Sequence, residues 1–392
     1  MRILHIIASV NPEGGGPIEG IKQMAREAST FGSIMEVLSL DDPAAPWVES
    51  FPLKVYALGP VNWLSKKLNY YYKSGVVAWL RAHGPEYDAV IVNGLWMYHS
   101  LAVWRALRKS SVPYFVFTHG MLDPWFKHTY PLKHLKKWLY WPWAEYRVLR
   151  DAKSVLFTCE EERILARQSF WLYHCDERVV GYGTAAPVGD AELQREAFLD
   201  AFPGLRGKRL LLFISRIHPK KGCDLLIEAF SQVAAQDASL HLVMAGPDQT
   251  GWKQDLVAQS EKLGIADRIT WTGMLSGDEK WGAYHAAEVF TLTSHQENFG
   301  IVVVEAMACG TPVLISNKVN IWREIEVDGA GLVANDDLAG AIEVLQKWID
   351  MTAEDRQRLN EKTLECFLKR FEIGTSTREL YRVMAGMNED IS

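Results

Sequence analysis

Short apolar runs alternate with amphipathic stretches along the whole chain, and this alternation limits the possible folds more than any other feature. The chain opens with an apolar run at 3–8, a glycine turn at 11–17 and an amphipathic stretch at 18–31. This order is typical of a strand, a turn and a helix. It predicts a parallel sheet in an α/β layer fold. Further strands are expected at 35–40, 89–92, 114–118, 154–158 and 178–180, and helices at 70–83 and 100–109.

The pattern starts a second time near residue 209. Glycines and prolines interrupt it over 182–208, and 392 residues are enough for two domains. We therefore predict one domain over 1–185, a second over 186–374, and a last segment, 375–392, whose helix could pack on either half. Two such domains would place a ligand cleft outside the carboxyl ends of their strands. The second domain is expected to have strands at 209–215, 241–245, 269–272, 289–293 and 312–316 and a helix at 224–235.

The composition, with 48% hydrophobic and 23% charged residues, is typical of a globular protein. A net charge of −6 argues against nucleic acid as a partner. The five cysteines are scattered without metal-ligand spacing, which predicts neither a zinc site nor a disulfide framework. No apolar stretch reaches the roughly 18 residues that a transmembrane helix needs. We expect a cytoplasmic protein.

A basic loop in the second half lies where a strand is expected to end and a helix to begin. Its sequence over 215–222 is Ser-Arg-Ile-His-Pro-Lys-Lys-Gly. Cations beside free backbone N–H groups at a helix N-terminus form a site for a diphosphate. Taken alone, Arg216 and Lys221 could equally belong to a solvated surface loop.

Two carboxylates, Glu297 and Glu305, follow further along the chain. The β-branched run at 301–304 favours a strand, but Gly310 followed by Pro312 favours the end of a helix, and we predict a helix. Glu297 would then lie in the loop before this helix and Glu305 within it. Carboxylates accept hydrogen bonds from ribose or sugar hydroxyls, although two glutamates at this spacing are more often surface charges.

Together, these motifs resemble the retaining glycosyltransferases of family 4, which have the GT-B fold. The resemblance also includes Thr118-His119-Gly120, the glycine turn at 14–17 and the Ala-Gly and Thr-Gly pairs at 245–246 and 272–273, and it covers essentially the whole chain. It implies two Rossmann-like domains facing each other across a cleft, with an acceptor-binding amino half and a donor-binding carboxyl half. It also implies a final helix that crosses back to the first domain. Many relatives have glycine where this chain has Ser215, a departure that removes no charge.

The resemblance implies roles for individual residues. Arg216 and Lys221 correspond to the pair that holds the donor diphosphate. Glu305 corresponds to the ribose ligand, and Glu297 to the group that holds hydroxyls of the donor sugar. His119 corresponds to the histidine that faces the transferred sugar, whereas a histidine at a strand end would otherwise more often be structural. The residues expected in catalysis are His119, Glu297, Arg216 and Lys221, and those expected to bind the donor are Gly15, Gly16, Arg216, Lys221, Gly246, Gly273, Met274, Glu297, Phe299, Gly300, Ile301 and Glu305.

The implied reaction builds negative charge on the departing diphosphate. Arg216, Lys221 and helix N-termini would stabilise that charge, by about 3 kcal/mol for each well-placed donor. No Asp-x-Asp motif is evident, so we expect neither a metal ion nor another cofactor. No carboxylate can be assigned as a nucleophile, and the resemblance suggests a front-face route in which the donor phosphate helps to deprotonate the acceptor.

Residues 123–150 combine aromatic and basic side chains, with four tryptophans, three tyrosines and six lysines or arginines against two acidic residues. Such mixtures are typical of segments at a membrane interface, which suggests peripheral contact with the inner face of the cytoplasmic membrane through 125–150. The rings could instead fill the core of the first domain or stack on sugar in an acceptor groove. The aromatic segment at 62–72 could join the same surface.

We therefore expect a retaining, metal-independent hexosyltransferase. Its donor would be a UDP-sugar, with UDP-glucose favoured by family frequency, and its acceptor a polysaccharide or lipid-linked oligosaccharide. Two alternatives stay open: a nucleotide-sugar epimerase or hydrolase on the same fold, and a non-catalytic module that binds sugar nucleotide or membrane. A phosphorylase that uses pyridoxal phosphate is disfavoured because the chain is short and has no recognisable cofactor lysine.

Overall fold

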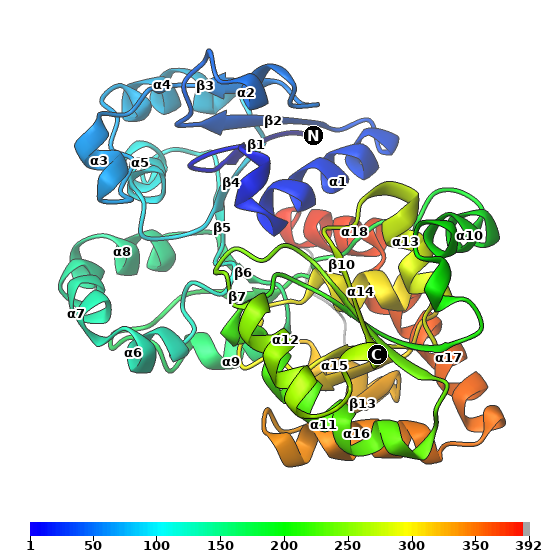
Figure 1. The fold of residues 1–392 in the computed structure, drawn as a ribbon. Coiled ribbons are helices and arrows are strands. Elements are labelled where there is room, and N and C mark those ends of the chain that lie inside the picture. Colours follow the sequence, from blue (N-terminus) through cyan, green and yellow to red (C-terminus); the bar gives the residue numbers. More distant parts are fainter. Residues whose placement is uncertain (387–392) are drawn as a thin grey trace. The chain divides into compact units, whose positions relative to one another are not determined.

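The computed structural model describes residues 1–386, which form two compact α/β units (Figure 1). Unit 1 consists of Met1–Gly183 and the chain from Ile373 onward, and unit 2 of Thr184–Glu372. The units therefore meet in sequence at 183/184 and 372/373, where we predicted 185/186 and 374/375. The end of the predicted last segment, 387–392, lies outside the described residues.

Unit 1 is built on a seven-stranded parallel sheet with the order β3-β2-β1-β4-β5-β6-β7. Its central strands are apolar runs buried on both faces, as expected where helices cover a parallel sheet. The strands are β1 (Arg2–Ile6), β2 (Ile34–Ser39), β3 (Val55–Ala57), β4 (Ala89–Asn93), β5 (Tyr114–Phe117), β6 (Ser154–Phe157) and β7 (Glu177–Val179). The helices are α1 (Gly16–Thr30), α2 (Pro46–Glu49), α3 (Trp63–Lys67), α4 (Val76–His83), α5 (Tyr98–Leu107), α6 (Trp125–Thr129), α7 (Pro131–Tyr140), α8 (Glu145–Arg150), α9 (Glu160–Ala166) and α18 (Ile373–Met384), with short 3-10 turns η1 (Pro12–Gly14), η2 (Gly84–Glu86) and η3 (Trp141–Trp143).

Unit 2 is built on a six-stranded parallel sheet with the order β10-β9-β8-β11-β12-β13. Both sheets confirm the predicted α/β architecture. The strands are β8 (Arg209–Ile214), β9 (Leu240–Ala245), β10 (Ile269–Gly273), β11 (Val289–Leu292), β12 (Val313–Ser316) and β13 (Gly331–Ala334). The helices are α10 (Ala191–Ala201), α11 (Cys223–Val233), α12 (Lys253–Lys262), α13 (Gly277–Ala286), α14 (Ile301–Ala308), α15 (Trp322–Asp328), α16 (Leu338–Asp350) and α17 (Ala353–Cys366), with short 3-10 helices η4 (Pro203–Leu205), η5 (Pro219–Lys221), η6 (Ala234–Gln236) and η7 (Ala266–Arg268) and a short π-helix η8 (Phe367–Phe371).

Two local predictions differ in their outcome. The run at 301–304 is helical, in α14, although three of its four residues are valine, so the helix prediction is confirmed. The helix expected over 70–83 begins only at Val76, and that prediction was wrong for its first residues. Gly75, which precedes α4, has a left-handed backbone with φ 93°, so a helix cannot run through it.

The last helix, α18, belongs to unit 1, where it packs against α1. The Tyr381 ring meets the Phe31 ring edge-on with centroids 6.1 Å apart. The Glu379 carboxylate accepts a hydrogen bond from the Gly181 backbone N–H at 3.2 Å. Within 1–386 no helix is both long enough and apolar enough to cross a bilayer.

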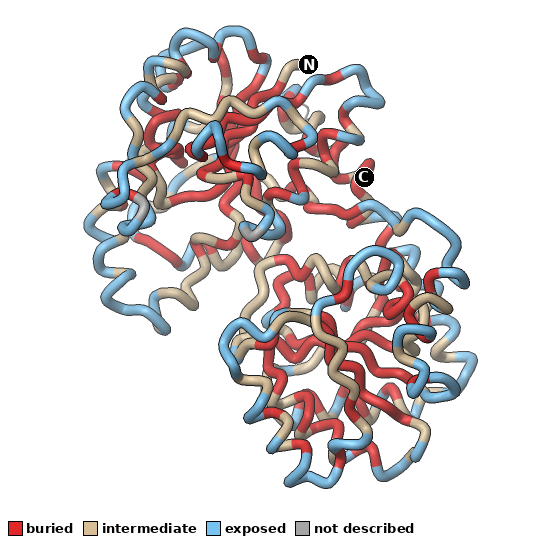
Figure 2. Tube along the Cα trace, turned by 45° about the horizontal axis from the view of Figure 1, so that its top comes forward, coloured by how far each residue is buried: buried red, intermediate tan, exposed pale blue. Residues whose placement is uncertain are grey.

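In each sheet, the strand order changes direction beside the first strand. β1 lies between β2 and β4, and β8 lies between β9 and β11. Ligands of open α/β sheets bind at such a switch point, outside the carboxyl ends of the strands. The switch points lie at the loops that follow β1 and β4 in unit 1 and β8 and β11 in unit 2. Figure 2 shows the buried positions gathered in the interior of each unit.

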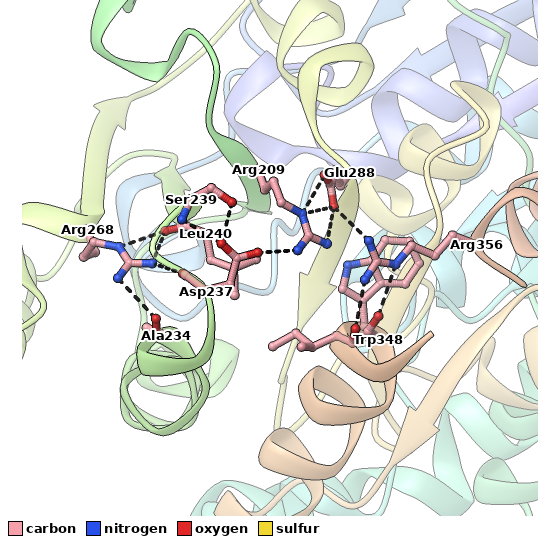
Figure 3. Close-up of polar contacts among 10 residues, drawn as sticks. Arg209, Ala234, Asp237, Ser239, Leu240, Arg268, Glu288, Trp348 and Arg356 are labelled. Carbon is pink, nitrogen blue, oxygen red and sulfur yellow. Dashed lines mark hydrogen bonds and ion pairs between the residues drawn. The ribbon is translucent and has the colours of Figure 1, made fainter. Parts of the chain in front are cut away.

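The opposite, amino-terminal edge of the unit 2 sheet is held by a cluster of arginines and carboxylates (Figure 3). Arg209 donates to Glu288 at 2.9 Å and to Asp237 at 2.5 Å, joining the segments that precede β9 and β11. Arg268 donates to the backbone carbonyls of Ala234 and Leu240. These groups satisfy one another's hydrogen bonds, so their role at this edge is to hold neighbouring segments of the sheet together.

Candidate active site

In unit 2 the predicted site residues lie on the loops that follow β8 and β11. The Lys221 ammonium forms an ion pair with the Glu297 carboxylate, so two of the predicted residues, 76 positions apart in sequence, are in direct contact. Both side chains are largely buried, with 9% and 22% of their surfaces exposed. Removing either side chain would leave the opposite charge largely buried without its partner, which is costly.

The close approach of the two loops depends on Gly222. Its backbone is left-handed, with φ 63°, and a Cβ atom there would lie 2.1 Å from the Thr293 backbone oxygen. The Thr293 hydroxyl donates to the Gly222 carbonyl at 2.8 Å, and the Ser294 hydroxyl donates to the Lys220 carbonyl at 2.9 Å. These contacts hold the end of the basic loop against the end of β11.

Two helices begin beside the Lys221–Glu297 pair, and glycine precedes each of them. Gly222 precedes α11 and Gly300, with φ 77°, precedes α14, and neither helix has a side-chain cap. The first N–H groups of a helix need partners, and together with the helix dipole they favour an anion. The site therefore offers one lysine and two helix N-termini to a phosphate group.

Arg216 lies on the same loop but is exposed, and its guanidinium donates to the Gln249 side chain at 3.4 Å. Burial and the nearby charges of Arg216, Lys220 and Lys221 lower the pKa of His218. The loop thus brings three cations, Arg216, Lys220 and Lys221, close to one another in sequence. Gly246 lies beside the loop, and a Cβ atom there would come within 1.8 Å of the Ser215 backbone oxygen.

Glu305 lies within α14 and is held by two neighbours from α13. Lys280 donates to one carboxylate oxygen at 2.8 Å, and the Tyr284 hydroxyl donates to the other at 3.1 Å. Burial raises the pKa of Tyr284 well above its usual value, so this hydroxyl keeps its proton. The Glu305 carboxylate is thereby fixed in place and still has lone pairs for a further donor.

The other predicted donor residues surround this centre. The Gly246 N–H donates to the Gly273 carbonyl at 2.7 Å, which places the ends of β9 and β10 side by side. Met274 follows with an exposed side chain. Phe299 is buried edge-on against Phe371, with centroids 5.8 Å apart, and Ile301 is the first residue of α14 after its Gly300 cap.

In unit 1, His119 follows β5 with a left-handed backbone, φ 47°. Its ring stacks on Phe117 with centroids 5.4 Å apart and meets the Tyr182 ring edge-on at 5.6 Å. The Tyr182 hydroxyl reaches the Gly16 carbonyl at 3.1 Å, at the start of α1. Gly15, with φ 74°, precedes α1 without a side-chain cap. The structure therefore joins His119 to the predicted glycine loop through Tyr182.

His119 Nε2 also lies 3.2 Å from the Asn93 side-chain oxygen. Four residues of these arrangements were not predicted from the sequence: Asn93 and Tyr182 in unit 1, and Lys280 and Tyr284 in unit 2. No motif marks them, because each acts through a contact with an element distant in sequence. The available signal was positional, since Asn93 is a polar residue that ends an otherwise apolar strand. Among the described residues, no group of three or more His, Cys, Asp or Glu side chains could hold a metal ion.

The aromatic segment divides between core and surface. Trp141 is fully buried and stacks on Phe170 with centroids 4.6 Å apart. Trp143, by contrast, is 70% exposed. Lys137 is half-buried, with its ammonium 4.6 Å from the centre of the Trp96 ring, and burial lowers its pKa to about 8. The core interpretation therefore holds for part of the segment, whereas α7 keeps several large apolar side chains exposed.

Both units match described protein families. Residues 15–183 match the family described as "Glycosyl transferase 4-like domain", and residues 196–365 match "Glycosyl transferases group 1". The chain belongs to the GT4-type GT-B glycosyltransferases. The two matches cover most of both units, and the resemblance inferred from the motifs is confirmed.

Individual relatives of this family are distant. The D-inositol 3-phosphate glycosyltransferase of Mycolicibacterium smegmatis is 25% identical over 367 residues, which cover 87% of this chain and 79% of the relative. The enzyme of the same name from Mycolicibacterium gilvum is 33% identical over 210 residues, 51% of this chain and 42% of the relative. In the match to the Mycolicibacterium gilvum enzyme, the chain therefore spans less than half of the relative's length.

Solved structures share the fold over nearly the whole chain. Sucrose-phosphate synthase from Thermosynechococcus elongatus superposes with a TM-score of 0.75 at 20% identity, covering 99% of this chain and 100% of that one. Anabaena HepE, in complex with UDP and glucose, superposes with a TM-score of 0.71 at 17% identity, covering 98% and 100%. At these identities the likeness establishes the fold, two Rossmann-like domains of the GT-B type.

Proposed function

We propose that this protein is a retaining glycosyltransferase that moves a hexose from a nucleotide diphosphate sugar to a glycan or lipid-linked acceptor. The observation that carries the proposal is the Lys221–Glu297 ion pair beside the uncapped N-termini of α11 and α14. UDP-glucose is the first donor to test, because HepE has been solved with UDP-glucose. A lipid acceptor has a precedent in the alpha-monoglucosyldiacylglycerol synthase of Streptococcus pneumoniae, 32% identical over 239 residues, 59% of this chain and 52% of that one.

In this proposal, the donor diphosphate lies against Lys221 and the two helix N-termini, with Arg216 closing from its exposed position. As the sugar leaves, charge grows on the diphosphate, and fixed positive groups stabilise it more strongly in the transition state than in the bound donor. Glu297, released from Lys221, accepts hydrogen bonds from sugar hydroxyls. Glu305, oriented by Lys280 and Tyr284, accepts from the ribose. His119 is assigned to the transferred sugar. The cationic side chains of Arg216 and Lys221 take the place of a metal ion at the diphosphate.

A nucleotide-sugar hydrolase or epimerase on the same fold is the alternative, since it would use the same donor groups. It would consume the donor at a rate independent of any acceptor, whereas a transferase needs an acceptor for fast turnover. A module that only binds the donor would show no turnover in either case.

The test is donor consumption, measured with and without a panel of glycan and lipid acceptors. We expect acceptor-dependent release of the nucleoside diphosphate, and a decrease of about a hundredfold in kcat for Lys221→Ala. Glu305→Gln should mainly weaken nucleotide binding. The glutamine side chain lacks the negative charge to which Lys280 and, in this proposal, the ribose hydroxyls donate hydrogen bonds. Lys262→Ala, at an exposed position in the last turn of α12, is the matched control and should keep the kcat and the nucleotide affinity of the parent protein. Full activity in Lys221→Ala would overturn the assignment of the donor site.

The acceptor side of the proposal rests on an exposed apolar surface of α7. We call it the α7 face, defined by Leu132, Leu135, Trp138 and Leu139, of which Leu132 is 83% and Leu139 61% exposed. Lys133 and Lys136 are exposed on the same helix, and no acidic residue occurs between Asp123 and Glu145. Apolar side chains among lysines suit the headgroup region of an anionic bilayer. We propose that this face binds such a membrane, where a lipid-linked acceptor would be presented.

A groove beside the α7 face supports this choice. It has a volume of about 810 Å³, and Trp138 and Trp171 lie along it with ring centroids 5.9 Å apart. Lys127 and Arg167 are also among its lining residues. Aromatic rings next to cations can accommodate the boundary between an acyl chain and a phosphate group.

A further inference from the structure

Asn93 ends β4 at the carboxyl edge of the unit 1 sheet and is 2% exposed. Three histidines meet it. His119 Nε2 lies 3.2 Å from the Asn93 side-chain oxygen, His5 Nδ1 lies 3.2 Å from the side-chain nitrogen, and His99 Nε2 lies 3.0 Å from the backbone carbonyl. One buried residue therefore contacts rings from β1, α5 and the loop after β5, two through its side-chain amide and one through its backbone carbonyl.

The orientation of this amide is fixed by groups that can only accept hydrogen bonds. Its nitrogen lies 3.3 Å from the Ile91 carbonyl and 3.4 Å from the Ile6 carbonyl. The reverse orientation would place the amide oxygen against two carbonyl oxygens, with no hydrogen between them. The NH2 group must therefore face the carbonyls, and the oxygen must face His119.

The protonation of His119 follows from this orientation. An amide oxygen has no hydrogen to give, so the bond requires a proton on His119 Nε2. In a neutral ring the other nitrogen, Nδ1, then carries a lone pair. Within residues 1–386, Nδ1 has no hydrogen-bond partner. The ring cannot turn away easily, because Phe117 stacks on it and Tyr182 meets it edge-on.

We propose that Asn93 is a positioning residue that holds His119 as the Nε2–H tautomer, so that Nδ1 accepts a hydrogen bond from a substrate hydroxyl. The tautomer stands on the geometry alone, and its use toward a sugar hydroxyl rests on the proposed function. Burial lowers the pKa of His119 to about 4, which keeps the ring neutral and the lone pair available at neutral pH. His119 would act as an acceptor of a hydrogen bond and not as a cation.

The direct test is the NMR spectrum of the full chain labelled with ¹⁵N in histidine side chains. Correlation through the ring protons distinguishes a protonated from an unprotonated nitrogen, and His119→Phe identifies the signals of His119 by their loss. At neutral pH we expect Nε2 protonated and Nδ1 unprotonated. A proton on Nδ1, alone or in an imidazolium ring, would overturn the proposal.

A variant links the tautomer to turnover. Asn93→Leu has a similar volume and lacks the amide, so His119 should lose its single tautomer, and kcat should fall about tenfold or more with little change in donor affinity. Val92→Ala, at the neighbouring buried position of β4, controls for destabilisation and should keep both the tautomer and kcat. An unchanged tautomer in Asn93→Leu would contradict the role of Asn93. If the parent protein turned over no sugar nucleotide, the proposed function would fail while the spectrum still decided the tautomer.

Discussion

Gly222 and Gly264 have nearly the same backbone conformation but different surroundings. Their φ angles are 63° and 69°, so alanine at either position pays the cost of a left-handed backbone, about 1–2 kcal/mol. A Cβ atom at 222 would lie 2.1 Å from the Thr293 oxygen, whereas at 264 it would meet nothing within 4 Å. The pair thus separates backbone strain from the contact that joins the β8 and β11 loops.

We predict that Gly222→Ala lowers both the melting temperature and donor turnover, because the Lys221 loop must move away from Glu297. Gly264→Ala should lose only the stability that the strained backbone costs and keep normal turnover. Thermal unfolding and steady-state kinetics of the two variants provide the comparison. Equal activity in both would show that the contact at Gly222 does not position the site.

Single residues also show how far the sequence could predict the site. Lys221 and Glu297 belong to motifs, and their meeting at one sheet edge follows once β8 and β11 are known to be neighbours. Asn93 and Tyr182 could not be predicted in the same way. Their importance depends on which side chains face them after folding, such as His119, and a single polar residue in an apolar strand does not reveal its partners.

At the scale of elements, local signals and tertiary contacts differ in what they predict. The start of α14 has valines that favour a strand, yet it is helical, as Gly310 followed by Pro312 predicted. The prediction of a helix at 70–83 is wrong for its first residues, because Gly75 adopts a left-handed backbone and the helix begins after it. The segment before it packs by aromatic contacts instead, with the Tyr70 and Tyr140 hydroxyl groups 2.9 Å apart. The periodicity of apolar residues in a sequence does not predict contacts of this kind, because they join segments that are distant in sequence.

The α7 face leads to a prediction about membranes. Reversing Lys133 and Lys136 to glutamate should lower the affinity for vesicles rich in phosphatidylglycerol by more than about tenfold, since each lysine near an anionic surface contributes about 1 kcal/mol. Lys137 is unsuitable because it is half-buried between Trp96 and Phe126. Co-sedimentation with vesicles measures the effect.

The matched control reverses Lys262 and Lys347, two exposed lysines of unit 2, and should bind as the parent does. Replacing Leu132 and Leu139 by serine should weaken binding to both anionic and neutral vesicles, because the apolar contact is lost. A parent protein that binds no vesicles of either kind would contradict the role of the α7 face.

For the whole molecule, buried histidines predict a loss of stability in acid. Burial lowers the pKa of His5 to about 3 and the pKa values of His99, His119 and His241 to about 4. The unfolded chain binds these protons near pH 6.5, so stability is full above that pH and falls as the pH decreases toward 4. Glu145 has the opposite effect, because burial raises its pKa to about 7 and its contribution is lost as the pH rises.

Four histidines outweigh one carboxyl group, so the melting temperature should fall between about pH 7 and pH 5. Glu145→Gln removes the opposing contribution and should make this fall steeper. Calorimetric scans of the two proteins across this range test the prediction. A flat or inverted dependence in the parent protein would contradict the assignment of buried, neutral histidines.

The central claim is that unit 2 binds a nucleotide diphosphate sugar through Lys221. It is tested most directly by the melting temperature in the presence of UDP, GDP, ADP, UDP-glucose and GDP-mannose, since a ligand that binds only the folded protein stabilises it. We expect one nucleotide class to raise the melting temperature of the parent and of Lys262→Ala, but not that of Lys221→Ala. No rise with any of them, together with no heat of binding in calorimetry at high ligand concentration, would contradict the claim.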